Sequence, residues 1–413
     1  MADDAPRAPH PGPLAGVRVL ELAQIMAGPT CGMLLADMGA DVIKVEKLPG
    51  GDDARGYREP RVNGVSAPFL MLNRNKRGIA IDLKRPEGRD VLLRMVRDAD
   101  VVTENYRRGT LEKLGLGYDV LARINPGLIY CAVSGFGREG PWRDKAGFDL
   151  IAQGFAGLMS ITGEPGGPPV KTGNSVADIN AGILAAVGIL AAFVHKLRTG
   201  KGQVVDTSLM EAALQQTYWH AAAYFATGKS PGATGSAHIL TAPYQAFRTA
   251  DGWINIGGAN QANWERIADV MGHPEWRTDG RFADNSSRMA NLEALVDAMN
   301  AVLAQRTTDD WLAAFDAAGV PAGPVHSVGE ALSHPQTHAR DMVVELDHAQ
   351  AGRTRALGCP IHFSATPTRI DRAAPVLGEH TREVLREFGY RDEEIDALAA
   401  RGVVALPDTV PAA

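Results

Sequence analysis

Cysteine is scarce in this sequence, which contains only three among 413 residues: Cys31, Cys131 and Cys359. Three cysteines cannot build the disulfide framework that stabilises many small secreted domains. None of them lies near a second cysteine or a histidine at the spacing of a metal site. We therefore expect a reducing, cytoplasmic location and no bound metal ion.

Two phosphate-binding glycine patterns are also missing. The first strand-to-helix turn contains Gly28 and Gly32 but no G-x-G-x-x-G, and the sequence has no G-x-x-x-x-G-K-[ST]. The first absence disfavours an NAD-dependent dehydrogenase, so we expect no NAD. Basic charge is not in excess, because 42 Lys and Arg residues stand against 48 Asp and Glu residues. Nucleic-acid binding needs a basic face, so we expect no nucleic-acid partner.

No apolar run is long enough to indicate a membrane span. The run without a polar side chain at residues 181–194 is shorter than the ~18 residues that a span needs, so we expect no membrane partner. Residues 1–13 are rich in proline and lack the apolar core of a secretion signal. We predict disordered tails at residues 1–13 and 406–413.

One apolar helix dominates the middle of the chain. Apolar residues recur at steps of three and four from Ile179 to Leu197, which predicts a helix buried in a large core. Asp178 lies at its start, where free N–H groups and the helix dipole favour the ionised carboxylate. Asp178 could simply cap the helix. The segment before the helix is rich in glycine, and the helix is predicted to be buried. Both features also suit a role for Asp178 as a nucleophile or base.

Strands and helices alternate in the part of the chain before this helix, over residues 14–135. Strands are predicted at residues 16–22, 41–46, 78–83, 100–104 and 128–134, with helices between them, which is typical of a parallel sheet. Ligands bind such sheets at the carboxyl ends of the strands. Basic residues gather there, at Lys47, in the run NRNKR at residues 73–77 and in NYRR at residues 105–108. This clustering favours a ligand that carries phosphate.

The regular alternation of strand and helix patterns ends after residue 225. We predict a large α/β domain over residues 14–225, a small domain over 226–330 with a strand pair around residues 244–256, and a return to the large domain over 331–405. The fold class is therefore α/β, with a Rossmann-like parallel-sheet domain built from N- and C-terminal segments and a smaller α+β domain.

A series of short motifs carries a resemblance to a known family. In order they read LAGVRVLEL, MAGP, MGADVIKVE, NRNKR, VTENY, GFG, AGFDL, VADINAG and TGKGQVVDTSLMEAAL. Each is weak alone, but their order and spacing resemble the class III CoA-transferases of the CaiB/BaiF type, which include the formyl-CoA transferases. The resemblance implies a CoA-transferase that moves CoA from an acyl-CoA donor to a carboxylic acid acceptor. It also implies a homodimer of interlocked chains.

The resemblance assigns roles to individual residues. Asp178 matches the nucleophile that carries an aspartyl-CoA thioester, and Gly257 and Gly258 match N–H donors to the oxyanion. Coenzyme A, as a substrate, is expected to contact nine residues by motif match: Met26, Ala27, Lys47, Asn73, Lys76, Asn105, Tyr106, Lys113 and Lys145. Met26 stands where the formyl-CoA transferases have glutamine, which disfavours oxalate or formate as the acid.

Two other functions stay open. The family's racemase branch uses an Asp and a His in an A-G-H-D motif to epimerise 2-methylacyl-CoA, but Phe148 stands at the histidine position here. A CoA-binding protein without turnover is the second alternative. His238 precedes the small-domain loops and could touch the acyl group.

Overall fold

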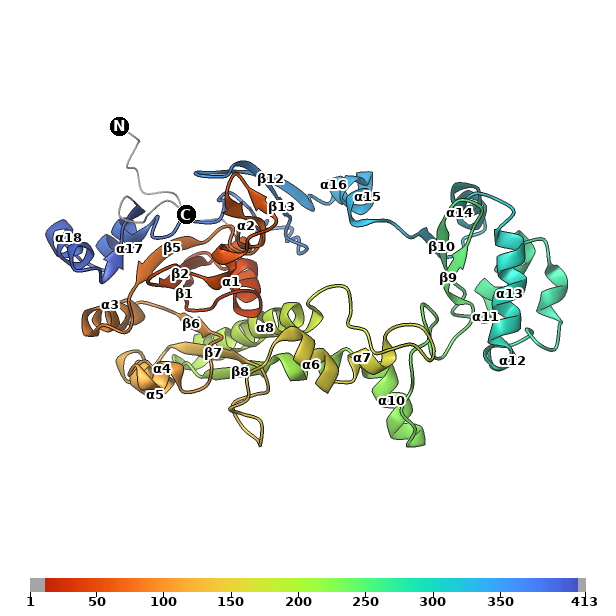
Figure 1. Ribbon diagram of the computed structural model, residues 1–413, viewed down its shortest axis with the longest axis horizontal. Helices are drawn as coiled ribbons and strands as arrows, with labels where there is room; N and C mark the ends of the chain where they lie inside the picture. Colours follow the sequence, from red (N-terminus) through yellow and green to blue (C-terminus); the bar gives the residue numbers. More distant parts are fainter. Residues whose placement is uncertain (1–11, 408–413) are drawn as a thin grey trace. The chain divides into compact units, whose positions relative to one another are not determined.

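The computed structural model describes residues 12–407, which form two compact units (Figure 1). Unit 1 contains the described residues 12–156, 173–216 and 335–407, and unit 2 contains 157–172 and 217–334. The segment 157–172 therefore belongs to unit 2, whereas the sequence reading placed it in the large domain. The predicted tails lie largely outside the described residues. Leu406 packs against the core of unit 1, so ordered structure continues past the predicted start of the C-terminal tail.

A seven-stranded sheet forms the centre of unit 1, in the order β14-β5-β2-β1-β6-β7-β8. Its strands are β1 (Arg18–Glu21), β2 (Asp41–Lys47), β5 (Arg77–Ile81), β6 (Val101–Glu104), β7 (Ile129–Ser134), β8 (Val204–Ser208) and β14 (Val404–Ala405). All neighbours pair in parallel except β14, which runs antiparallel to β5. The predicted α/β class is confirmed, as is the sharing of one sheet by N- and C-terminal segments.

The remaining elements of unit 1 cover or extend this sheet. Its helices are α1 (Ala27–Asp37), α2 (Ala67–Leu72), α3 (Pro86–Val96), α4 (Thr110–Lys113), α5 (Tyr118–Ile124), α6 (Asp149–Phe155), α8 (Val176–Thr199), α9 (Leu209–Gln215), α16 (Pro335–Ala339), α17 (Thr381–Glu387), α18 (Asp392–Ala400) and the 3₁₀ turn η1 (Asp53–Gly56). Two hairpins complete it, β3 (Arg61–Val62) with β4 (Val65–Ser66) and β12 (Val343–His348) with β13 (Gly352–Leu357).

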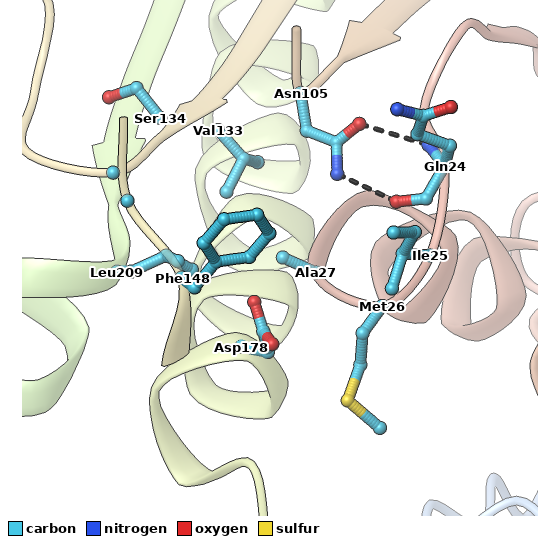
Figure 2. A pocket seen from close by; sticks show the side chains of 12 residues that line it. Gln24, Ile25, Met26, Ala27, Asn105, Val133, Ser134, Phe148, Asp178 and Leu209 are labelled. Atoms are coloured by element: carbon cyan, nitrogen blue, oxygen red, sulfur yellow. Dashed lines mark hydrogen bonds between the residues drawn. The ribbon is translucent and has the colours of Figure 1, made fainter. Parts of the chain in front are cut away.

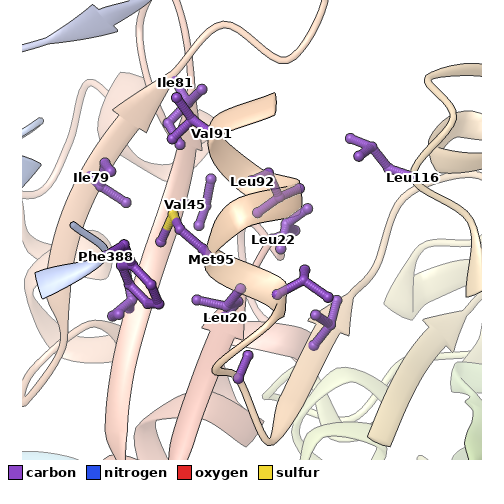
Figure 3. Close-up of a cluster of buried hydrophobic side chains, with 14 of the residues drawn as sticks. Leu20, Leu22, Val45, Ile79, Ile81, Val91, Leu92, Met95, Leu116 and Phe388 are labelled. Atoms are coloured by element: carbon purple, nitrogen blue, oxygen red, sulfur yellow. The ribbon is translucent and has the colours of Figure 1, made fainter. Parts of the chain in front are cut away.

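The two faces of the sheet differ in chemistry. Because side chains alternate along a strand, Leu20, Val45 and Ile79 point to one face. They form a core with residues of α3 such as Leu92 and Met95 (Figure 3). The intervening residues Glu21 and Lys44 point to the face that α1 covers, and both are fully buried. Apolar side chains fill one face of the sheet, and charged side chains lie beneath α1 on the other.

Unit 2 is the predicted smaller α+β domain. Its antiparallel sheet has the order β11-β10-β9, from β9 (Tyr244–Arg248), β10 (Trp253–Gly257) and β11 (Ala322–Pro324). Its helices are α7 (Leu158–Ile161), α10 (Tyr218–Thr227), α11 (Gln261–Val270), α12 (Asn285–Ala290), α13 (Leu292–Leu303), α14 (Thr308–Ala317), α15 (Val328–Ser333) and the 3₁₀ turn η2 (Pro274–Arg277). Phe247, Trp264 and Phe315 are central to its core.

The long helix α8 corrects two expectations. It has 24 residues, so by length and composition alone it could cross a membrane, and the length argument against a span is wrong. Its small residues Ala181, Gly182 and Ala185 are buried in unit 1, where α8 packs against α1, α9 and β7. The helix is also not buried all round, because Val187 and Leu197 are 57% and 73% exposed.

We predict that Gly182→Ala lowers the thermal stability of the protein. A β-carbon at Gly182 would lie 2.5 Å from the Ala27 carbonyl oxygen and 2.7 Å from Thr30 Cβ, so α1 and α8 would have to separate. Overpacking of this kind costs about 1–3 kcal/mol. Gly329→Ala in α15 is the control, because nothing lies within 4 Å of that added carbon. Equal melting temperatures for the two variants would contradict this close packing.

Candidate active site

The candidate site lies where the order of the parallel sheet reverses. Counting only the parallel strands, the order is 3-2-1-4-5-6, and ligands bind such sheets beside the strands on either side of the reversal. Those strands are β1 and β6, which are followed by Gln24 and Asn105. The Gln24 N–H donates to Asn105 Oδ1 at 2.9 Å, and Asn105 Nδ2 donates to the Gln24 carbonyl at 2.8 Å (Figure 2). This reciprocal pair of hydrogen bonds joins the segments that follow β1 and β6 at the site.

A cavity of about 140 Å³ opens beside this pair. Twelve residues line it: Gln24, Ile25, Met26, Ala27, Asn105, Val133, Ser134, Gly135, Gly147, Phe148, Asp178 and Leu209. Asp178 is the one acidic or basic residue among them, and it lines the cavity together with Phe148 and Ala27 (Figure 2). The cavity therefore offers a single charged group among uncharged polar and apolar side chains.

The carboxylate of Asp178 is kept free of hydrogen bonds. In the described part of the chain no donor reaches it, although Asp178 stands in the first turn of α8. The N–H groups of that turn instead meet Asp149 Oδ1, at 2.8 Å from Ala177 N and 3.4 Å from Asp178 N. The capping role considered for Asp178 thus belongs to Asp149, for which the sequence reading found no role.

The electrostatics of Asp178 differ from the expectation. Burial, and secondly the charge of Asp149, raise the pKa of the Asp178 carboxyl from 3.8 to about 6. The sequence reading expected hydrogen bonds and the helix dipole to favour the ionised form, but Asp149 takes those N–H groups. Asp178 is still mostly ionised at pH 7, and it is a stronger base than an ordinary aspartate.

The loop between β1 and α1 is held in an unusual conformation. Ile25 has a φ of +65°, which a β-branched residue rarely adopts. Its N–H donates to Asp52 Oδ1 at 2.9 Å, and Lys44 Nζ lies 2.8 Å from Asp52 Oδ2. Local strain of this kind persists only where surrounding contacts impose it, and it gathers at functional sites. Here it places Ile25 and Met26 in the cavity wall.

A buried ionic network supports this loop from beneath. Lys44 and Lys76 share Glu21, with Nζ to Oε1 distances of 3.1 and 3.0 Å. Lys76 Nζ also donates to the Pro29 carbonyl and to Asn73 Oδ1, both at 2.9 Å. Lys76 and Asn73 have no exposed surface. The structure therefore argues against a direct phosphate contact by either residue, because their polar atoms already have partners inside the protein.

The other residues predicted to contact CoA are of three kinds: some line the cavity, one packs against the core, and three are exposed lysines. Met26, Ala27 and Asn105 line the cavity, although both polar atoms of the Asn105 amide are bonded to Gln24. Tyr106 packs against the core of the sheet. The exposed lysines Lys47, Lys113 and Lys145 stay predictions; Lys47 pairs with Asp53, and the Lys145 ammonium lies over the Trp142 ring.

The predicted oxyanion donors belong to unit 2. The Gly257 N–H donates to the Pro321 carbonyl at 2.9 Å, and the Gly258 N–H donates to the Pro243 carbonyl at 2.7 Å. Both groups are therefore engaged in the described structure, and stabilising an oxyanion would require these bonds to open. His238 is also in unit 2, where its Nδ1 accepts the Leu240 N–H at 3.2 Å. The acyl contact considered for His238 stays a prediction.

Comparison with known proteins identifies the family. Residues 14–381 match the family described as CoA-transferase family III. The chain is 41% identical to the succinate–glutarate CoA-transferase of Agrobacterium fabrum over 382 residues, covering 91% of this chain and 96% of that protein. It is 35% identical to the human succinyl-CoA:glutarate CoA-transferase over 398 residues, covering 96% and 91%.

A solved structure agrees with these relatives. The crystal structure of a CAIB/BAIF family protein from Brucella suis is 40% identical and superposes with a TM-score of 0.81, covering 91% of this chain and 99% of that chain. The protein therefore belongs to CoA-transferase family III, as the motifs predicted. It is an enzyme of this class, with CoA thioesters as substrates.

We predict that Lys76→Ala destabilises the fold rather than weakening CoA binding directly. Removing one partner of a buried ionic network costs about 3–5 kcal/mol, because the remaining charge is left without compensation. Lys47→Ala is the control, since the exposed ion pair of this lysine with Asp53 contributes at most about 1 kcal/mol. Melting temperature and calorimetric CoA affinity are measured together. A Lys76→Ala protein of unchanged stability that has lost CoA affinity would restore the phosphate contact.

Proposed function

We propose that the protein transfers CoA between carboxylic acids through a covalent intermediate on Asp178. The observation that carries this proposal is the Asp178 carboxylate, which is the one charged group among the lining residues of a small cavity and accepts no hydrogen bond within the described residues. Hydrogen bonds would lower the nucleophilicity of a carboxylate, and a pKa of about 6 leaves it ionised yet more basic than usual. The transferase reading is also favoured over racemisation, because Phe148 supplies no second base to the cavity.

The chemistry proceeds in two halves. An Asp178 oxygen attacks the thioester carbonyl of the donor, the C–S bond breaks, and CoA leaves as a thiolate. The product is an aspartyl–acyl anhydride. The thiolate then attacks the aspartyl carbonyl, the anhydride C–O bond breaks, and the donor acid leaves as a carboxylate. Asp178 now carries CoA as a thioester, and an acceptor carboxylate repeats both steps in reverse to release its own CoA thioester.

The apolar side chains in the lining of the cavity suit these intermediates. Anhydrides and thioesters are hydrolysed by water, so a transferase must exclude it while the acids exchange. Ile25, Met26 and Phe148 contribute apolar surface around Asp178. A carboxylate in such surroundings also loses less of its reactivity to hydration.

Dicarboxylic acids are the proposed substrate class, with succinyl-CoA as the first donor to test and glutarate as the first acceptor. The support comes from the relatives in Agrobacterium fabrum and Homo sapiens, whose names carry these acids. No lysine or arginine lines the cavity in unit 1, so the second carboxylate of such an acid would have to bind outside it. A cytoplasmic location stays a prediction.

We predict that Asp178→Asn abolishes transfer while CoA still binds. Asparagine keeps the shape of the side chain but loses the charge and most of its nucleophilicity, so exchange should fall by about three orders of magnitude or more. In the wild-type protein, hydroxylamine trapping after incubation with succinyl-CoA should modify Asp178, as located by peptide mass spectrometry. Asp119→Asn is the control, because Asp119 is an exposed acid in the first turn of α5. A folded Asp178→Asn protein with normal exchange would refute the mechanism.

We also propose that the protein is a homodimer, with a second copy covering the exposed apolar side of α8. Ile183, Val187, Val194 and Leu197 are all exposed in the single chain. A contiguous apolar face of this kind on a long helix is typical of a protein interface. The interlocked arrangement that the family resemblance implies stays a prediction.

Sedimentation at micromolar concentration should give twice the chain mass of 43.9 kDa. Val187→Asp places a charge on the exposed side of α8, and it should shift the protein toward monomer because an unpaired charge would be buried in the interface. Asp119→Asn again serves as the control. A wild-type protein that sediments as an active monomer would exclude the dimer.

A further inference from the structure

We propose that Asp149 is the positioning residue of the nucleophile: it caps the helix that carries Asp178 and so leaves the Asp178 carboxylate free to react. This inference rests on the proposed function of Asp178 and deepens it. Asp149 lies in α6, the helix that follows the loop bearing Phe148, and it reaches α8 across 28 positions of sequence.

The first step of the argument concerns the start of α8. A helix begins with N–H groups that lack partners within the helix, and a nearby side chain usually satisfies them. The local candidate, Ser175, makes no such bond. Asp149 Oδ1 accepts from Ala177 N at 2.8 Å and lies 3.4 Å from Asp178 N. Asp149 on α6 therefore caps α8, and the Asp178 carboxylate does not accept a hydrogen bond from the N–H groups at the start of its own helix.

The second step concerns what holds Asp149 in place. Its Oδ2 accepts from Gln153 Nε2 at 2.6 Å, one turn further along α6. Gln153 is fully buried, and its Nε2 also donates to the Asn174 carbonyl at 3.3 Å, just before α8 begins. Asp149 and Gln153 thus connect α6 to the start of α8 through both carboxylate oxygens and one amide.

The third step concerns charge. The elements packed on α8 carry several other ionisable groups: Cys31 and Asp37 on α1, Tyr130 and Cys131 on β7, Asp206 on β8 and Glu211 on α9. Only Asp149 adds to burial in raising the pKa of Asp178 to about 6. Because a like charge disfavours the ionised form, the same residue that frees the carboxylate also makes it more basic.

Two variants separate the cap from the charge. Asp149→Asn keeps an oxygen that can accept from Ala177 N but removes the charge, whereas Asp149→Ala removes both. The first measurement is the rate of thioester formation on Asp178 in a single turnover with succinyl-CoA, from pH 4.5 to 8. In the wild-type protein the rate should rise with ionisation of Asp178, with a midpoint at about pH 6.

The expected results differ between the variants. Asp149→Asn should move the midpoint down by roughly 0.5–1 pH unit and slow the reaction at pH 7.5 by a few-fold, because the carboxylate is less basic. Asp149→Ala should slow it by roughly ten- to a hundred-fold, because the start of α8 also loses its cap. An Asp149→Asn protein with the wild-type midpoint, or an Asp149→Ala protein with the wild-type rate, would overturn the proposal.

A second measurement decides the question without turnover. A water-soluble carbodiimide activates protonated carboxyls, so peptide mapping of its label on Asp178 against pH reports the titration of that side chain. Asp149→Asn should lower this midpoint too, and an unchanged midpoint would overturn the proposal. If the wild-type protein formed no thioester on Asp178, the proposed function would fail, while the labelling experiment would still decide the effect of Asp149 on Asp178.

Discussion

The arrangement of the site depends on one hydrogen bond, from the Ala177 N–H to Asp149 Oδ1. An aspartate in the first turn of a helix ordinarily folds back to satisfy the backbone, which stabilises the helix and makes the carboxylate unreactive. Here a second aspartate from α6 satisfies that need. Asp178 is consequently left with its charge, a raised pKa and a cavity in front of it. Under the proposed mechanism, helix capping and nucleophilic attack are therefore assigned to two different carboxylates.

Buried charged residues of the sheet support the loop between β1 and α1, which contributes Ile25 and Met26 to the lining of the cavity. A buried network of two acidic and two basic side chains balances its own charges; its members are Glu21, Lys44, Asp52 and Lys76. Asp52 also accepts the hydrogen bond from the N–H of Ile25, which holds that residue in its strained conformation. Buried ionic groups are costly unless each is paired, so the network tolerates little change in geometry. That intolerance makes the network suited to imposing a fixed conformation on the loop that lines the cavity with Asp178.

Most of the fold could be predicted from the sequence, because the signals are local. Alternating strand and helix patterns placed β1, β2 and β6 within a few residues, and the apolar period located α8 with Asp178 at its start. Segment 157–172 instead belongs to unit 2, although it was predicted to lie in the large domain. Domain membership depends on long-range packing, which has no local signal.

The site was harder to predict for the same physical reason. Asp178 could be found because it lies at the start of a conspicuous helix, but the capping contact of Asp149 depends on the packing of α6 against α8. Lys76 was predicted to contact CoA, whereas its side chain points inward to Glu21. A lysine next to a strand can face either solvent or the helix that covers the sheet. Its direction depends on how α1 packs on the sheet, which is a long-range contact. The charged residues at alternate positions in DVIKVE were a usable sign of a polar layer beneath a helix.

The central claim is that Asp178 is an unbonded carboxylate whose surroundings raise its pKa. The direct measurement is an infrared titration of the wild-type protein, with the spectrum of Asp178→Asn subtracted at each pH to isolate the carboxyl band of Asp178. The account predicts that the protonated carboxyl band appears with a midpoint at about pH 6. A midpoint at or below the ordinary 3.8 would mean that Asp178 is stabilised by hydrogen bonds as a capping residue, and it would contradict the account.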